Sequence, residues 1–315
     1  MNALTALLSE SLDYAGLFPP AALPMAEAWR EFRRQLTMGE RWLLGGFVCP
    51  AARLEELAVC VEADDGPLPL VLLAARPDGP DGGARLAEDQ ARWRAFEGRF
   101  PDRAQLRGWE IRLPDVAAEG LESLLAVGAE QLPGECPLFW EPDPAWDEER
   151  LEGLGQALAA QRLVSRRHGY KLRCGGTRAE DFPSVPRVAW VLGLVRRHEL
   201  PLKLTAGLHH PLRHYRPEPG VWMHGFLNVY LAALAARSHG LESRDLEAIL
   251  GETRADAFRQ RPDRLSWREL TVDIVEIRES RAWLAGLGSC SVDEPVADLQ
   301  ALGWLPRSST ESEGT

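Results

Sequence analysis

Short apolar runs alternate with longer amphipathic segments along most of the chain, and this alternation constrains the fold more than any other feature. Each apolar run has the length of a buried β-strand, and each segment between two runs is long enough for an α-helix. Six strands are predicted, over residues 41–49, 68–75, 107–114, 136–142, 169–176 and 201–207. Strands separated by helices pair in parallel through crossover connections. Six such units in succession favour a closed (β/α)8 barrel, the TIM-like α/β fold, over an open sheet.

The chain after residue 210 is less regular. Residues 223–236 indicate mainly helix, with a candidate short seventh strand at their start, and residues 285–292 indicate an eighth strand. Residues 243–252 and 266–283 indicate two further helices. The sequence therefore predicts a barrel with an irregular seventh unit.

Three regions follow from this pattern. We predict that residues 1–40, which hold two helical pieces, form an extension packed on the barrel, and that residues 41–306 form the barrel domain. The polar residues 307–315 are expected to form a disordered tail. Residues 13–20 lie in the extension, and the sequence leaves open whether they cover the mouth of the barrel or plug its floor.

The net charge of −11 in 315 residues bears on partners and location. Nucleic-acid binders and proteins of acidic membrane surfaces need a basic face, so we expect neither kind of partner. The five cysteines are far apart, and the N-terminus lacks the basic start and long apolar run of a signal peptide. These features predict a cytoplasmic protein with reduced thiols. A homo-oligomer is compatible with the sequence.

Polar side chains occupy one face of several predicted strands. Because side chains alternate along a strand, residues two apart share a face. The pairs that share a face are Glu110 with Arg112, Lys171 with Arg173, and Lys203 with Thr205, and Glu141 ends another strand. A charge that points at the covering helices is costly without a partner. We therefore expect these residues to point into the barrel near its C-terminal mouth, where TIM-barrel enzymes hold their active sites.

Two interpretations of these charges stay open. In one, they bind a ligand. In the other, Glu110, Arg112, Glu141, Lys171 and Arg173 are a structural network of ion pairs that closes the barrel. Both can hold together, because a binding site needs its charges oriented.

The segment PLKLTAGLHHPLRH places histidines just after the strand that carries Lys203. His209 and His210 are candidates for moving protons, because imidazole titrates near neutral pH. A divalent metal bound by the histidines, with Glu141 or Asp293 as a carboxylate ligand, is the alternative. No HExxH or HxH motif supports that alternative.

Four further residues are candidates for substrate binding. Gly175 and Gly176 follow the Lys171 strand, and a Gly-Gly turn permits close approach of backbone N–H groups to an anion. His224 and Asn228 are four residues apart, so they share a face if the segment is helical.

The segment KLTAG, with Lys203 at its start, resembles the strand-six Lys-x-Ser/Thr-x-Gly segment of the deoxyribose-phosphate aldolase group. That resemblance implies a lysine that forms a Schiff base, with Lys171 in place of the second lysine of the family. The segments DYAGLFPPA, KLRCGG, TAGLHHP, HGFLNV and GSCSVDEP together resemble an uncharacterised bacterial protein family. This second resemblance implies no activity.

The sequence thus predicts a barrel enzyme that acts on a small anionic substrate, a carboxylate or a phosphate, by lyase or aldolase-type chemistry. The predicted catalytic residues are Lys203, Lys171, His209, His210 and Glu141, and the predicted substrate-binding residues are Arg173, Gly175, Gly176, Thr205, His224, Asn228, Glu110 and Arg112. No cofactor is predicted. The alternatives are a metal-dependent hydrolase or isomerase that uses the histidines, and a non-catalytic barrel that binds a ligand or a partner protein.

Overall fold

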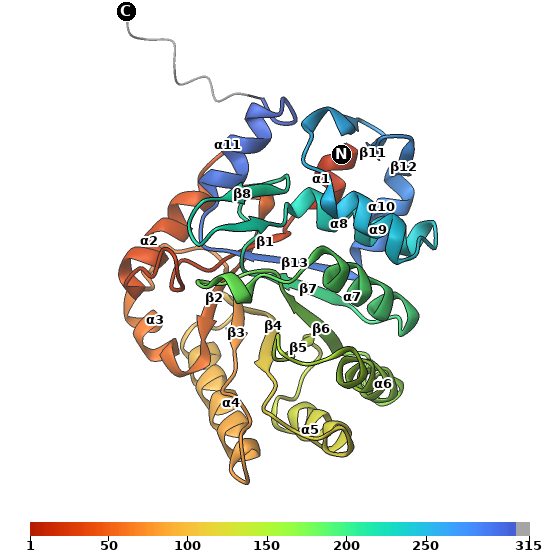
Figure 1. The fold of residues 1–315 in the computed structure, drawn as a ribbon. Coiled ribbons are helices and arrows are strands. Elements are labelled where there is room, and N and C mark those ends of the chain that lie inside the picture. The colour runs from red at the N-terminus through yellow and green to blue at the C-terminus, as the bar shows by residue number, and fades with distance from the viewer. Residues whose placement is uncertain (307–315) are drawn as a thin grey trace, which may run out of the picture.

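The computed structural model describes residues 1–306, except for the side chains of residues 118 and 119, and its centre is a closed barrel of eight parallel strands (Figure 1). The predicted (β/α)8 architecture is confirmed. In order around the barrel, the strands are β1 (Leu12–Tyr14), β13 (Leu284–Ser289), β7 (Leu202–Thr205), β6 (His168–Arg173), β5 (Leu138–Glu141), β4 (Ala104–Arg112), β3 (Leu68–Leu73) and β2 (Leu44–Pro50). The predicted tail, residues 307–315, lies outside the described residues.

Helices follow seven of these strands and cover the outside of the barrel (Figure 1). They are α2 (Met25–Leu36), α3 (Leu54–Cys60), α4 (Gly82–Arg99), α5 (Ala118–Gln131), α6 (Glu148–Val164), α7 (Val185–Arg197) and α11 (Asp293–Ala301). Local sequence sets where some of them begin. Asp147 and Ser184 accept backbone N–H groups at the starts of α6 and α7, as N-cap residues do.

Residues 1–40 are not only a helical extension, as the sequence suggested, because they supply the first barrel strand. After α1 (Ala3–Leu8), β1 pairs in parallel with both β2 and β13 and so closes the barrel. Three residues are too few to show the alternation that reveals a strand. The strand that carries Lys203 is consequently the seventh of the barrel rather than the sixth, which departs from the aldolase resemblance.

The irregular unit lies between β7 and β13. It begins with an antiparallel hairpin of β8 (His214–Arg216) and β9 (Val221–Met223), so the candidate seventh strand near residue 223 is not part of the barrel. The helices α8 (Phe226–Ser238) and α9 (Ser243–Gly251) follow, and then a three-stranded sheet of β10 (Phe258–Arg261), β11 (Arg264–Trp267) and β12 (Leu270–Asp273). The helix α10 (Ile274–Arg281) leads into β13, the predicted eighth strand.

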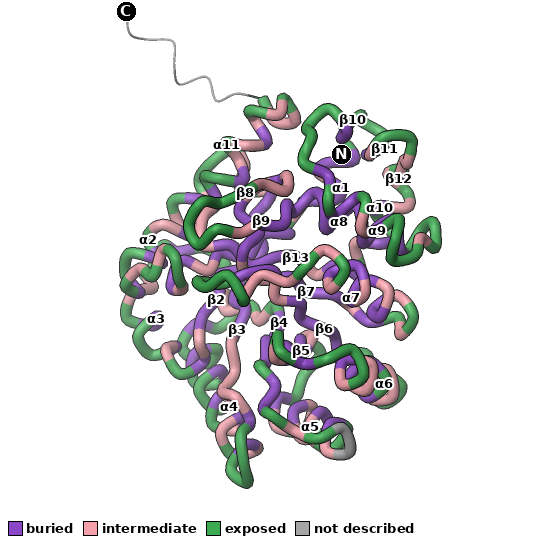
Figure 2. Tube along the Cα trace, viewed as in Figure 1, coloured by how far each residue is buried: buried purple, intermediate pink, exposed green. Residues whose placement is uncertain are grey.

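One predicted helix is therefore mostly wrong. Residues 266–283 hold the turn between β11 and β12, and only their second half is helical. Arg268 adopts a φ of 50°, a left-handed conformation that suits the turn between two antiparallel strands. The helix α8 is buried over nearly its whole length, as Figure 2 shows, which agrees with its largely apolar sequence.

The outward faces of the barrel strands carry the hydrophobic core. Trp109, Trp140, Tyr170 and Leu204 are buried between the strands and the helices, in agreement with the alternation in the sequence. Near the N-terminus of the chain, Tyr14 of β1 stacks on Phe32 of α2 with ring centroids 6.2 Å apart. The opposite, inward faces are therefore left to the polar residues that build the site.

Candidate active site

Lys171 lies at the centre of the barrel between two carboxylates. Its Nζ is 2.7 Å from Glu110 Oε2 and 2.6 Å from Glu141 Oε2, and all three side chains are at most 5% exposed. The side chains come from three adjacent strands, β4, β5 and β6, and point inward as the alternation predicts. Burial alone would lower the pKa of Lys171, but the two carboxylates outweigh it and raise that pKa. Lys171 is therefore an ammonium ion at neutral pH.

Arg173 extends this cluster toward the mouth of the barrel. Its Nε donates to Glu141 Oε1 over 2.7 Å, and its side chain is 33% exposed. Burial would raise the pKa of Glu141, but the charges of Lys171 and Arg173 outweigh it and hold that pKa at about 2. Glu141 is therefore a carboxylate that orients two cations.

Lys203 extends the same cluster toward the opposite end. Its Nζ donates to Asp13 on β1 and lies 3.9 Å from Glu110 Oε1. The other oxygen of Asp13, Oδ1, accepts the backbone N–H of Gly46 over 2.7 Å. Burial lowers the pKa of Lys203 to about 7, and the charge of Arg281 acts in the same direction. Six side chains of alternating charge thus cross the barrel interior, and Glu110 joins the two lysines.

A cavity of about 820 Å³ opens above Lys171 at the C-terminal ends of the strands. This mouth cavity has the size of a small-molecule site. It also has the position that active sites take in TIM barrels. Eight of the predicted site residues line it: Glu110, Arg112, Glu141, Lys171, Arg173, Gly176, Thr205 and His209.

His209 is the histidine that reaches the mouth cavity. Its Nδ1 lies 3.3 Å from Glu294 Oε2, at the start of α11, and 3.8 Å from Cys290 Sγ. Burial lowers the pKa of His209, although the nearby Glu294 acts in the opposite direction. The imidazole is therefore neutral at neutral pH, and the carboxylate orients the ring in the manner of a general base.

Three arginines besides Arg173 line the mouth cavity. Arg112 pairs with Asp143 over 3.3 Å, and Arg178 pairs with Asp181 over 3.1 Å. Arg216, on the β8–β9 hairpin, makes no ion pair within residues 1–306. These guanidinium groups make the mouth cavity locally basic in a protein of net negative charge, so the cavity favours an anion.

The other five predicted catalytic or binding residues do not line the mouth cavity, and Lys203, His210 and Gly175 are three of them. Lys203 lines a different cavity, below the ion pairs. His210 points away, with its Nδ1 2.5 Å from Asp298 and its ring packed edge-on against His214. Gly175 serves chain packing, because a Cβ there would lie 2.8 Å from the Cα of Gly207 in the neighbouring loop.

His224 and Asn228 do not share a ligand either. His224 is fully buried, and its Nε2 donates to the carbonyl of Pro183 over 2.7 Å. Asn228 accepts the N–H of Arg213 and donates to the carbonyls of Ile249 and Glu252, so its amide is committed to the backbone. Neither side chain lines the mouth cavity.

The sequence pattern did not reveal two other residues of the site, Asp13 and Glu294. Asp13 lies on a strand that the pattern did not reveal, and Glu294 meets His209 from a distant helix. Residues 13–20 do not act as one unit: Asp13 lies inside the barrel, while Phe18, Pro19 and Pro20 line the mouth. The amino-acid composition held one signal that pointed to the two lysines of the barrel. The chain has 36 lysines and arginines, and Lys171 and Lys203 are its only lysines.

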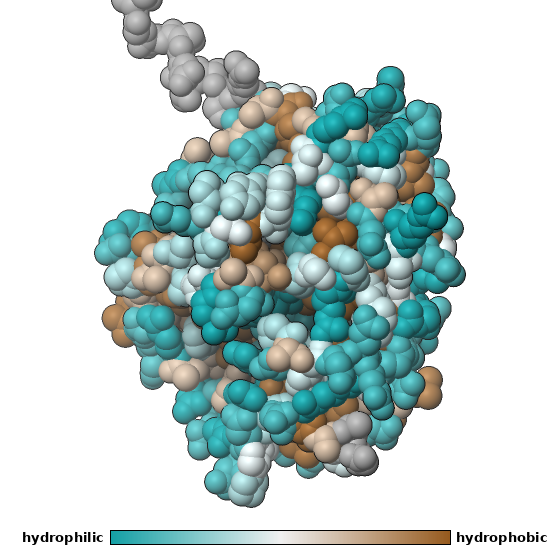
Figure 3. Space-filling model, in the orientation of Figure 1, coloured by the Kyte–Doolittle hydropathy of each residue, from teal (hydrophilic) through white to brown (hydrophobic). Residues whose placement is uncertain are grey.

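Three further observations on the described residues concern a metal ion, a partner protein and a membrane. Within residues 1–306, no three His, Cys, Asp or Glu side chains are grouped so that they could hold a metal ion. The face in Figure 3 is mostly hydrophilic, with small scattered hydrophobic patches rather than a broad apolar surface for a partner. None of the helices in the described part has both the length and the apolar composition needed to span a bilayer.

Comparison with known proteins gives no further assignment. No protein-family model matches the sequence, and no curated protein matches it at a significant level.

Proposed function

We propose that the protein is a barrel enzyme that acts on a small anionic substrate, a carboxylate or a phosphate ester, in the mouth cavity. The observation that carries this proposal is the ammonium of Lys171, held between Glu110 and Glu141 at the base of a cavity lined by arginines. Fixed cations in a buried cavity stabilise negative charge much better than water does, because they need no reorganisation.

Arg173 is the proposed anchor for the anionic group. Its Nε is occupied by Glu141, and its Nη1 makes only a long contact of 3.4 Å with the carbonyl of Gly175. The remaining N–H groups form the planar donor edge that carboxylates and phosphates prefer. Glu141 is then a positioning residue, because it sets the orientation of both Arg173 and Lys171.

Lys171 and His209 supply the proposed chemistry. Neutral His209 removes a proton from the substrate, and the electron pair left on the substrate moves onto a carbonyl oxygen as an enolate. Lys171 stabilises that oxygen as a charged donor. The same groups serve aldol cleavage, in which the proton comes from a hydroxyl and the carbon–carbon bond breaks to give the enolate.

The positions of the lysines favour this electrostatic form over a Schiff base. An amine must be neutral to attack a carbonyl, and the carboxylates keep Lys171 charged. Lys203 has the lower pKa but does not line the mouth cavity. Borohydride treatment with keto acids or sugar phosphates is therefore expected to leave both lysines unmodified.

The proposal is tested by proton exchange in D₂O, followed by proton NMR. With pyruvate, 2-oxobutyrate and dihydroxyacetone phosphate as probes, we expect the protein to accelerate exchange of the proton next to the carbonyl of at least one. His209→Asn is expected to lower the rate about a hundredfold or more, the usual contribution of a general base.

His239→Asn is the matched control, because His239 pairs with Glu276 outside the mouth cavity and should leave the rate unchanged. Exchange no faster than background with all three probes, or equal rates for His209→Asn and the unmodified protein, would contradict the proposal.

A further inference from the structure

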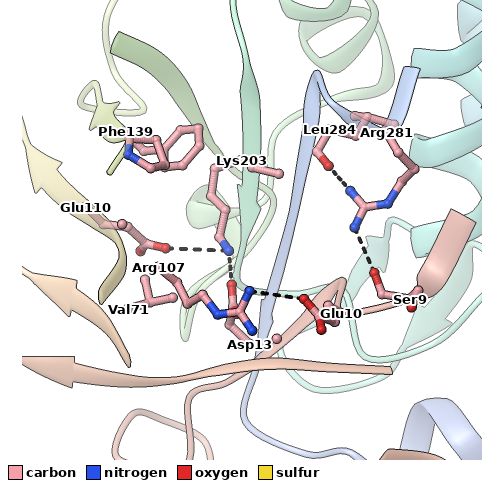
Figure 4. A pocket seen from close by; sticks show the side chains of 14 residues that line it. Ser9, Glu10, Asp13, Val71, Arg107, Glu110, Phe139, Lys203, Arg281 and Leu284 are labelled. Atoms are coloured by element: carbon pink, nitrogen blue, oxygen red, sulfur yellow. Dashed lines mark hydrogen bonds and ion pairs between the residues drawn. The ribbon is translucent and has the colours of Figure 1, made fainter. Parts of the chain in front are cut away.

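A second cavity, of about 350 Å³, lies at the opposite end of the barrel from the mouth (Figure 4). This floor cavity is lined by residues before β1 and β5 and at the start of β13, and it shares only Glu110 with the mouth cavity. The floor of a TIM barrel is ordinarily packed with branched apolar side chains. A hollow there needs an explanation from the sequence.

Two glycines account for the missing side chains. Gly108 shares the inward face of β4 with Glu110, and Gly169 shares the inward face of β6 with Lys171. A Cβ at Gly169 would lie 2.7 Å from the ring of Phe139, which leans over it. The layer below the ion pairs therefore lacks side chains on at least two of its strands, and Phe139 and Val71 form apolar parts of its wall.

The charges around the floor cavity leave one cation without a carboxylate. While Lys203 is protonated, its ammonium and the carboxylate of Asp13 form a pair that carries no net charge. At the rim, Arg107 and Glu10 form a second pair over 3.1 Å.

Glu110 is engaged by Lys171. Arg281 differs from these groups. It donates to the carbonyls of Leu284 and Ser9, as Figure 4 shows, and has no carboxylate partner within residues 1–306.

We propose that the floor cavity is a binding site for a small aliphatic carboxylate, with its charged group between Arg281 and Lys203 and its apolar part against Phe139 and Val71. A monoanion balances the charge of Arg281 in a partly buried space. A dianion such as phosphate fits less well, because Asp13, Glu110 and Glu10 also line the cavity. The low pKa of Lys203, which Arg281 helps to lower, is the expected state of this site without an anion.

The site is independent of the function proposed for the mouth. No residue of the floor cavity except Glu110 belongs to the mouth cavity, so each proposal can fail without the other.

Calorimetric titration with butyrate tests the proposal, with butylamine as the probe of similar size and opposite charge. We expect saturable binding of butyrate and none of butylamine. Arg281→Gln should weaken butyrate binding about tenfold or more, because a charged hydrogen-bond donor is lost. Glu10→Gln, at the exposed rim, should tighten it about two- to fivefold, because it releases the charge of Arg107.

The signal of Lys203 locates the bound anion. In protein labelled with ¹³C-lysine, saturating butyrate should raise the midpoint at which Lys203 titrates, because a nearby anion favours the ammonium. Absence of saturable binding, equal binding of butylamine, or binding that leaves the Lys203 titration unchanged would each overturn the proposal. If Arg281→Gln does not fold, the tighter butyrate binding expected for Glu10→Gln still tests the proposal.

Discussion

Burying a lysine inside a barrel costs free energy unless the ammonium contacts carboxylates, and Lys171 contacts two. Removing water from an ammonium and two carboxylates costs several kcal/mol per ion, and the close contacts with Glu110 and Glu141 offset that cost only while all partners are present. The buried pairs therefore serve orientation more than stability. Removing one partner should lower the free energy of unfolding, because the remaining charges stay buried without a countercharge.

Glu141→Gln measures this cost. We expect it to lower the free energy of unfolding by about 3 kcal/mol at pH 7, because Lys171 and Arg173 lose a buried countercharge. The folded pKa of Glu141, about 2, is depressed below its ordinary value of 4.5. Its stabilisation is therefore complete above about pH 4.5 and is lost as the pH falls toward 2.

Urea unfolding of both proteins at pH 7 and pH 3 is the measurement. The difference in stability between them should shrink by about 2 kcal/mol at the lower pH, since Glu141 is then almost fully protonated in the unfolded chain and mostly ionised in the folded one. A difference that is the same at both pH values would show that the charge of Glu141 does not stabilise the fold.

At the scale of elements, the shortest strand closes the barrel. β1 joins β2 to β13, and β13 comes close enough only because it carries a glycine opposite the start of β1. Gly286 has a φ of 128°, and a Cβ there would lie 2.6 Å from the carbonyl oxygen of Ser11. Backbone conformation and space therefore both require glycine at this point.

Gly286→Ala should destabilise the protein by about 2 kcal/mol or more, from strain at a positive φ and from contact with Ser11. Gly39→Ala is the matched control, because nothing lies within 4 Å of a Cβ at that position, and it should change stability by less than about 0.5 kcal/mol. Thermal unfolding compares the two variants. Equal melting temperatures would mean that the junction of β1 and β13 tolerates a side chain.

At the scale of the whole molecule, the sequence predicts the barrel well and the site in part. Regular alternation identified β2 to β7, and the shared face of Lys171 and Arg173 placed both residues at the mouth. The pattern missed β1 because it is three residues long, and it misjudged residues 266–283 because short antiparallel strands resemble helix at that length.

The local sequence pattern also does not indicate how far along the barrel axis a side chain lies, toward the mouth or toward the floor. Lys203 and Lys171 are neighbours in the register of β6 and β7, yet they line different cavities. Their contacts decide this, because Lys203 turns to Asp13 and Lys171 to Glu141. Contacts between distant segments of this kind cannot be read from spacing along the chain. His224 and Asn228 failed as predicted ligands for the same reason, since their partners are backbone carbonyls far away in sequence.

The central claim is that two buried lysines hold different charge states, one at each cavity. Because the chain has only these two lysines, ¹³C-lysine labelling gives one NMR signal for each, and Lys203→Arg assigns them. The account predicts that Lys203 titrates near pH 7 and that Lys171 stays protonated beyond pH 10.5. If Lys171 lost its proton below that pH, or if both lysines titrated together, the cation at the base of the mouth cavity would not exist as described.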